Sequence, residues 1–93
     1  MTVRIEKICG TFAENKDQAR QIREEVIRPV LARKQAITLD FTGVDSSTQS
    51  FIHALISTFF QECGERALKR FRFKGCNEAV SSLVTTVINY SLE

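Results

Sequence analysis

Three stretches of the chain have the two-residue period that is typical of a strand with one buried face: residues 2–9, 36–41 and 68–74. In the middle stretch, AITLDF, the side chains of Ile37, Leu39 and Phe41 face one way, and β-propensity is high throughout. We therefore expect this strand at the centre of a sheet. In the last stretch, Phe71 and Phe73 lie opposite a row of basic residues, which indicates a strand at the sheet's edge.

The first of three predicted helices follows Asn15, whose side chain suits an N-cap with Gln18 at the capping-box spacing. Its apolar residues recur every three or four positions and predict a buried stripe of Ala19, Ile22, Val26 and Val30. The polar residues Arg20, Arg23, Glu24 and Arg28 are expected to face water. Pro29 lacks a backbone donor, so the helix kinks or ends near Arg28, with a last turn that reaches toward Arg33.

Apolar residues on two adjacent tracks between Phe51 and Cys63 predict a second helix, which Gly64 can end, and a third begins after the candidate N-cap Asn77. The order of elements is therefore β-α-β-α-β-α in a single domain, residues 1–93. Helices between successive strands favour right-handed parallel crossovers, which predicts an α/β fold with a small, mostly parallel sheet. Because partners meet such sheets at the carboxyl ends of strands, the loop over residues 41–50 is the candidate functional region.

Composition supports an ordinary globular domain, with 43% hydrophobic and 26% charged residues. No apolar run approaches the ~20 residues that cross a bilayer, and the N-terminus does not resemble a signal peptide, so we expect a cytoplasmic protein. Three cysteines without a C-x-x-C motif predict reduced, packing thiols rather than disulfides or a metal site. We expect no cofactor, and a net charge of +2 predicts no nucleic-acid partner unless basic residues gather on one face.

The loop after the central strand ends in hydroxyl-bearing residues at the start of the second helix. Either Ser47 or Thr48 can cap this helix, which leaves Ser50 in the first turn beside unpaired N–H groups and the positive end of the helix dipole. A phosphate on Ser50 would be stabilised in that position.

This arrangement resembles the STAS domain, the fold of anti-sigma-factor antagonists, and most closely the short STAS-like proteins of unassigned function. The corresponding family stretch is L-D-L-S-x-V-x-x-x-D-S-S-G-L, in which a partner kinase phosphorylates the second Ser of D-S-S. The segment LDFTGV, residues 39–44, matches its strand and turn, and Ser50 then occupies the phosphorylated position. Thr48 stands where the family has Asp, and Phe51 where it has Gly.

The resemblance implies a non-enzymatic regulatory module that docks on an ATP-binding, histidine-kinase-like protein and is switched by phosphorylation of Ser50. Whether the chain also forms a homodimer stays open. The implied partner surface comprises the exposed loop and the start of the following helix: Asp40, Thr42, Asp45, Ser47, Thr48, Gln49, Ser50, Phe51 and His53.

Each of the central site residues also has a simpler interpretation. Ser50 can belong to the capping residues of the helix, and Asp40 can anchor the loop rather than face a ligand. His53 lies three residues after Ser50 and so on the same helix face, which suggests a Ser-His pair. Because no G-x-S-x-G motif or third member accompanies the pair, a surface histidine is the favoured interpretation.

A second function class follows from the basic residues of the last strand. Cations that alternate with Phe71 and Phe73 can follow a nucleic-acid backbone while the aromatic rings stack on bases. The alternation also puts the two kinds on opposite faces, which favours a packed Phe pair and a solvated basic row. The residues of this alternative site are Lys69, Arg70, Arg72 and Lys74.

Overall fold

A three-stranded parallel sheet organises the computed structural model, which describes residues 1–93. Its strands are β1 (Thr2–Arg4), β3 (Ile37–Asp40) and β5 (Phe71–Lys74), in the order β1-β3-β5. Leu39 lies between Val3 and Phe73 in the pairing register. The predicted α/β class, the parallel pairing, the central place of β3 and the edge place of β5 are therefore confirmed.

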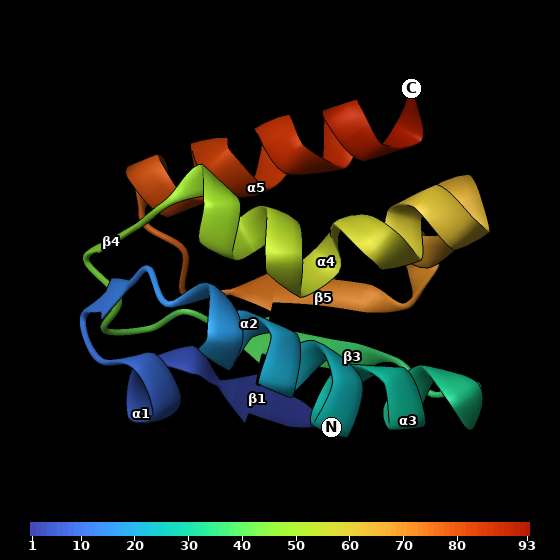
Figure 1. Cartoon of the computed structure of the whole chain (residues 1–93), viewed down its shortest axis with the longest axis horizontal. Coiled ribbons are helices and arrows are strands. Elements are labelled where there is room, and N and C mark those ends of the chain that lie inside the picture. The colour runs from blue at the N-terminus through green and yellow to red at the C-terminus, as the bar shows by residue number, and fades with distance from the viewer.

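The helices pack against one another beside the sheet, as Figure 1 shows. A long helical rod consists of α2 (Lys16–Ile22), a π-helical turn (Arg23–Ile27) and α3 (Arg28–Ala32). The next helix, α4 (Gln49–Cys63), packs against α2 and continues into a 3₁₀ segment (Gly64–Lys69). The last helix, α5 (Glu78–Leu92), lies along α4 on the side away from the strands. No helix combines the length and apolar composition that a membrane crossing requires.

One continuous core joins these elements. It consists of buried apolar side chains from every major helix and strand; the largest that are fully buried are Phe41, Phe51, Phe60, Ile5, Ile27, Ile37, Leu39, Ile52, Leu55 and Ile56. Phe71 lies between Phe60 and Phe73, with ring centroids 5.3 and 6.1 Å away. The helix α4 packs against α2 and α5, and its residues Phe59 and Phe60 contact Phe71 of β5.

The first strand is shorter than the predicted stretch 2–9. It ends at Arg4, and residues 5–9 form a one-turn helix, α1 (Ile5–Cys9), which Gly10 ends at a φ of 76°. Ile5 is fully buried and Cys9 partly so, while Ile8 is 45% exposed. A four-residue interval between the inward positions suits a helix, and the alternation of Val3 with Ile5 is compatible with either structure.

The long rod passes through Pro29, and the π-helical turn lies immediately before it. In a regular helix, the Pro29 ring would crowd the carbonyl of Glu25 and leave an N–H missing from the hydrogen-bond ladder. The wider turn shifts the buried face by one residue, so Ile27 is buried and Val26 is only half-buried. The predicted stripe is fully buried at Ala19, Ile22 and Val30, while Val26 packs against the core but is only partly buried.

Three other details also differ from the sequence predictions. The strand predicted over residues 68–74 begins at Phe71, because residues 64–69 continue from α4 as a 3₁₀ segment. In α4 it is Phe60 that is buried, while Cys63 is exposed. Gln18 donates to the carbonyl of Ile8 (3.3 Å), so the Asn15 N-cap lacks the reciprocal capping-box bond.

Candidate functional site

The loop between β3 and α4 is held in place by contacts with two other parts of the chain. Residues 46–47 form a short strand, β4 (Ser46–Ser47), which pairs in parallel with β2 (Phe12–Ala13). The Ser47 hydroxyl donates to the carbonyl of Ala13 (2.7 Å). From the other side, the Asn77 amide donates to the carbonyl of Asp45 (2.8 Å) while its carbonyl oxygen caps α5. These long-range bonds make the loop a fixed platform rather than a free turn.

The N-terminus of α4 rises from this platform. Thr48 is the N-cap, and its hydroxyl accepts a hydrogen bond from the backbone N–H of Phe51 (3.1 Å). Gln49 and Ser50 are the first two helical residues, and both are exposed. The next residues, Phe51 and Ile52, are fully buried. Ser50 therefore presents its hydroxyl to solvent from a helix turn that is anchored directly in the core.

Asp40 acts within the chain as a loop anchor. Its Oδ1 accepts hydrogen bonds from the backbone N–H (2.9 Å) and the hydroxyl (2.6 Å) of Thr42. These bonds, with the nearby charges of Lys74 and Arg4, lower the pKa of the Asp40 carboxyl below its ordinary value. Gly75 has a φ of 69° and lies so close to Thr42 that a Cβ there would overlap that residue. The end of β3 is therefore tightly specified.

A shallow hollow of about 570 Å³ lies between α2 and the start of α4. Its walls include Gln49, Ser50, His53 and Ala54 from α4, and Lys16, Arg20 and Arg23 from α2 and the turn after it. His53 is exposed and takes part in none of the site's hydrogen bonds. Ser50 and His53 thus share a concave surface with three cations.

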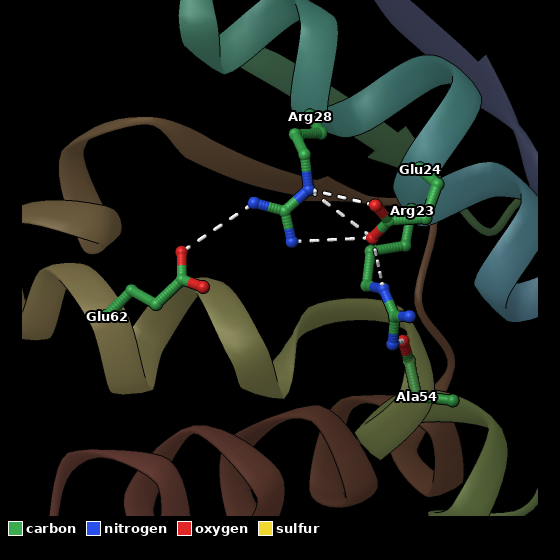
Figure 2. Close-up of polar contacts among 5 residues, drawn as sticks. All are labelled: Arg23, Glu24, Arg28, Ala54 and Glu62. Atoms are coloured by element: carbon green, nitrogen blue, oxygen red, sulfur yellow. Dashed lines mark hydrogen bonds and ion pairs between the residues drawn. The ribbon is translucent and has the colours of Figure 1, made fainter.

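The hollow's position is fixed by contacts between the helical rod and α4, as Figure 2 shows. An Arg23 guanidinium nitrogen donates to the carbonyl of Ala54 (3.0 Å), and its Nε donates to Glu24 (2.7 Å). Arg28 bonds Glu24 (3.1 Å), contacts Glu62 (3.7 Å) and places its guanidinium 5.1 Å from the centre of a phenyl ring in α4. The hydrogen bonds from Arg23 and Arg28 lower the pKa of the Glu24 carboxyl. Arg23, expected to face water, is therefore part of this bridge.

The residues that the sequence assigns to the site separate into two groups. Thr42, Asp45, Gln49, Ser50 and His53 are exposed and lie on or beside the platform. The hydroxyls of Ser47 and Thr48 are half-buried and bonded to backbone groups. The side chain of Phe51 is fully buried, so the assignment of Phe51 to a partner surface is wrong. Ser50, the residue before it, is nevertheless exposed, because successive helix residues point about 100° apart.

The cations of the hollow were not assigned to the site from sequence. Arg20 and Arg23 precede Ser50 by about thirty positions in a solvated helix face, and no local spacing connects them with α4. Lys16, which follows the Asn15 cap, also has no local sequence signal that connects it with α4. Only the packing of α2 against α4 brings these side chains to Ser50.

The alternative nucleic-acid residues do not form one continuous row. Arg72 and Lys74 are exposed on one face of β5, whereas Lys69 precedes the strand and Arg70 is half-buried. Phe71 and Phe73 pack toward the core, on the opposite face from Arg72 and Lys74. The strand therefore offers no aromatic platform for stacked bases beside its cations.

The parallel sheet, the anchored turn after β3 and the hydroxyl-rich start of α4 define a small α/β module with a surface site and no deep cleft. Residues 18–81 match a protein family described as a STAS-like domain of unknown function. This match covers more than half of the chain, and the protein belongs to that family. No curated protein and no solved structure matches the chain.

Proposed function

We propose that this protein is a non-enzymatic regulatory module that binds an ATP-binding, histidine-kinase-like partner through the loop before α4 and the helix's first turn. The partner transfers the γ-phosphoryl group of ATP to Ser50 Oγ, which loses its proton while ADP leaves. The added dianion then weakens the contact between the two proteins.

The exposure of Ser50 on an anchored helix turn is the observation that carries this proposal. The hydrogen bond from the Phe51 N–H to the Thr48 hydroxyl caps the turn. The fully buried side chains of Phe51 and Ile52 anchor it in the core. A hydroxyl in this position is accessible to another protein's active site without local unfolding. Because the surface is preorganised, docking requires little ordering of the chain.

The geometry of the platform also supports protein binding over catalysis. The hollow beside Ser50 is shallow, and the Ser50 hydroxyl, the one hydroxyl among its lining residues, has no hydrogen bond to His53. No side chain that could act as a general base is hydrogen-bonded to the Ser50 hydroxyl. Exposed polar side chains that are held on rigid elements can bind a folded partner at little cost in ordering.

The partner can be recovered by co-purification from the native cell, with the mass of the peptide containing Ser50 measured in the same sample. Affinity for that purified partner is then compared between the wild type, Ser50→Ala and Ser50→Glu. We expect Ser50→Glu to weaken binding at least about tenfold, which corresponds to about 1.4 kcal/mol, and Ser50→Ala to change it little.

Thr85→Glu is the matched control. Thr85 is exposed on α5, so this substitution adds the same charge far from the platform. The control should bind like the wild type. Equal affinity of all four proteins for the partner would rule out the proposed switch.

A further inference from the structure

The residues that line the hollow between α2 and α4 include cations and no carboxylate. Three of its seven lining residues, Lys16, Arg20 and Arg23, are cationic, and none carries a negative charge. The Ser50 hydroxyl opens onto the same surface. A concave surface with several cations concentrates positive potential, which favours an anionic group of matching size.

Two of these cations are free to contact a new anion. Lys16 takes part in no ion pair or side-chain hydrogen bond. Arg20 is paired only with Asp17 (3.0 Å), and the two side chains are 56% and 87% exposed, so solvent screens the pair. A phosphate dianion has more charge and more acceptor oxygens than that carboxylate, and it competes well for the guanidinium.

The third cation gives the hollow a rigid wall. The side chain of Arg23 is only 21% exposed, and its hydrogen bonds to Ala54 and Glu24 fix the guanidinium beside Ala54 of α4. Lys16, in contrast, is the first residue of α2, where the helix dipole disfavours a positive charge. An anion in the hollow would offset this unfavourable interaction between the Lys16 charge and the helix dipole.

We propose that this hollow is an intramolecular receptor for the phosphate of phosphorylated Ser50, with Lys16 and Arg20 as its mobile contacts and Arg23 as its fixed wall. Phosphorylation then changes the docking surface in two ways. It places a dianion on the first turn of α4, and it withdraws Lys16 and Arg20 from any acidic group that a partner presents. The proposal depends on the proposed function only in taking Ser50 as the modified residue.

The test is a ³¹P NMR pH titration of the chain carrying phosphoserine at position 50, introduced during synthesis, with no partner present. The second ionisation of a free phosphoserine has a pKa of about 6. Cations that contact the phosphate favour the dianion, so we expect a pKa about one pH unit below that of the control described next.

The control places phosphoserine instead of Ala79 in a Glu78→Gln background. Position 79 is the second residue of a helix as long as α4, and the glutamine introduced before it then matches Gln49 before Ser50. This control reproduces the helix dipole and the local sequence without the cations. A difference between positions 50 and 79 therefore reports the hollow rather than the helix N-terminus.

Lys16→Gln with Arg20→Gln should raise the phosphate pKa at position 50 by about half a pH unit or more. Arg33→Gln with Lys34→Gln, which removes the same charge from the far end of the rod, should leave it within about 0.2. If the double variant loses its folded circular-dichroism spectrum, Lys16→Gln alone should shift the pKa in the same direction by less.

Equal phosphate pKa values at positions 50 and 79, or a value at position 50 that does not respond to loss of Lys16 and Arg20, would overturn the receptor. These outcomes are independent of any partner. A lowered pKa combined with unchanged partner affinity of Ser50→Glu would leave the receptor intact and reject the proposed switch.

Discussion

The N-termini of α4 and α5 have similar local chemistry but different surroundings. Both helices have fifteen residues, and both begin at a polar cap whose oxygen accepts the N–H of the third helical residue. At α5, the remaining amide of Asn77 holds the loop before α4. At α4, the second helical residue is the exposed Ser50, which faces a cationic hollow. The comparison teaches that a cap makes a helix begin, while the element packed beside it decides what its first turn can bind.

The largest expected effect comes from the core beneath the α4 turn. Phe51→Ala should lower the free energy of unfolding by about 3–5 kcal/mol, because it empties a fully buried aromatic site. The corresponding residue at α5 is Val80, which is smaller and equally buried, so Val80→Ala should be less damaging. Urea denaturation measures both. A larger loss at Val80 would contradict the view that Phe51 anchors the functional turn.

A second expected effect concerns the turn that precedes α5. Gly75→Ala requires a Cβ at positive φ that would overlap Thr42, so it should destabilise the fold by more than about 2 kcal/mol. Gly10→Ala is the matched control, since Gly10 has a similar φ and no atom near its Cβ direction. That variant has only the backbone strain of a non-glycine residue at positive φ, about 1–3 kcal/mol, and should therefore lose less stability than Gly75→Ala in denaturant midpoint analysis. Equal losses would show that the contact with Thr42 is unimportant.

The two caps should differ in strength. Thr48→Ala removes one capping bond and should lower stability by about 1 kcal/mol. Asn77→Ala removes a cap and also the amide that holds the carbonyl of Asp45, so it should lower stability by about 2 kcal/mol. Thermal and chemical denaturation together measure this difference. Identical losses would indicate that the bond between Asn77 and the loop adds nothing.

A fourth expected effect is a response to acid at Asp40, which precedes the loop before α4. The pKa of the Asp40 carboxyl is lowered in the folded protein by its bonds to Thr42, so this group stabilises the fold above the unfolded pKa of about 3.9. That contribution is lost as pH falls through the folded pKa. Thr42→Val, which removes the hydroxyl donor, should flatten the decline in urea midpoint between about pH 5 and pH 2. An unchanged slope would mean that the hydroxyl does not lower this pKa.

The smallest effect is expected at Ser50, the position proposed for modification. Ser50 is exposed and does not cap the helix, so Ser50→Ala should change stability by less than about 0.5 kcal/mol. Ala79→Ser places a hydroxyl at the equivalent point of α5 and should be equally neutral. Differential scanning calorimetry checks both variants. A loss well above this limit at Ser50 would mean that binding defects of Ser50 variants report folding rather than contact.

Much of the fold was predictable because its signals are local. The two-residue period of residues 36–41 predicts the central strand, and Asn15, Gly64 and Asn77 mark helix ends at the residues where the structure has them. The exposed position of Ser50 follows from the same helix start. The short pairing of β2 with β4 was missed, because two-residue strands have no detectable period.

The amino-acid sequence by itself determined the order of the three sheet strands and the main helices, the helix caps and the presence of a hydroxyl in the first turn of α4. These features depend on side-chain sterics and hydrogen bonds between near neighbours in the chain. Only the tertiary structure decided that Ile27 is more deeply buried than Val26 and that Lys16, Arg20 and Arg23 gather beside Ser50. Those outcomes depend on how the helical rod packs against another helix, where residues about thirty positions apart become neighbours.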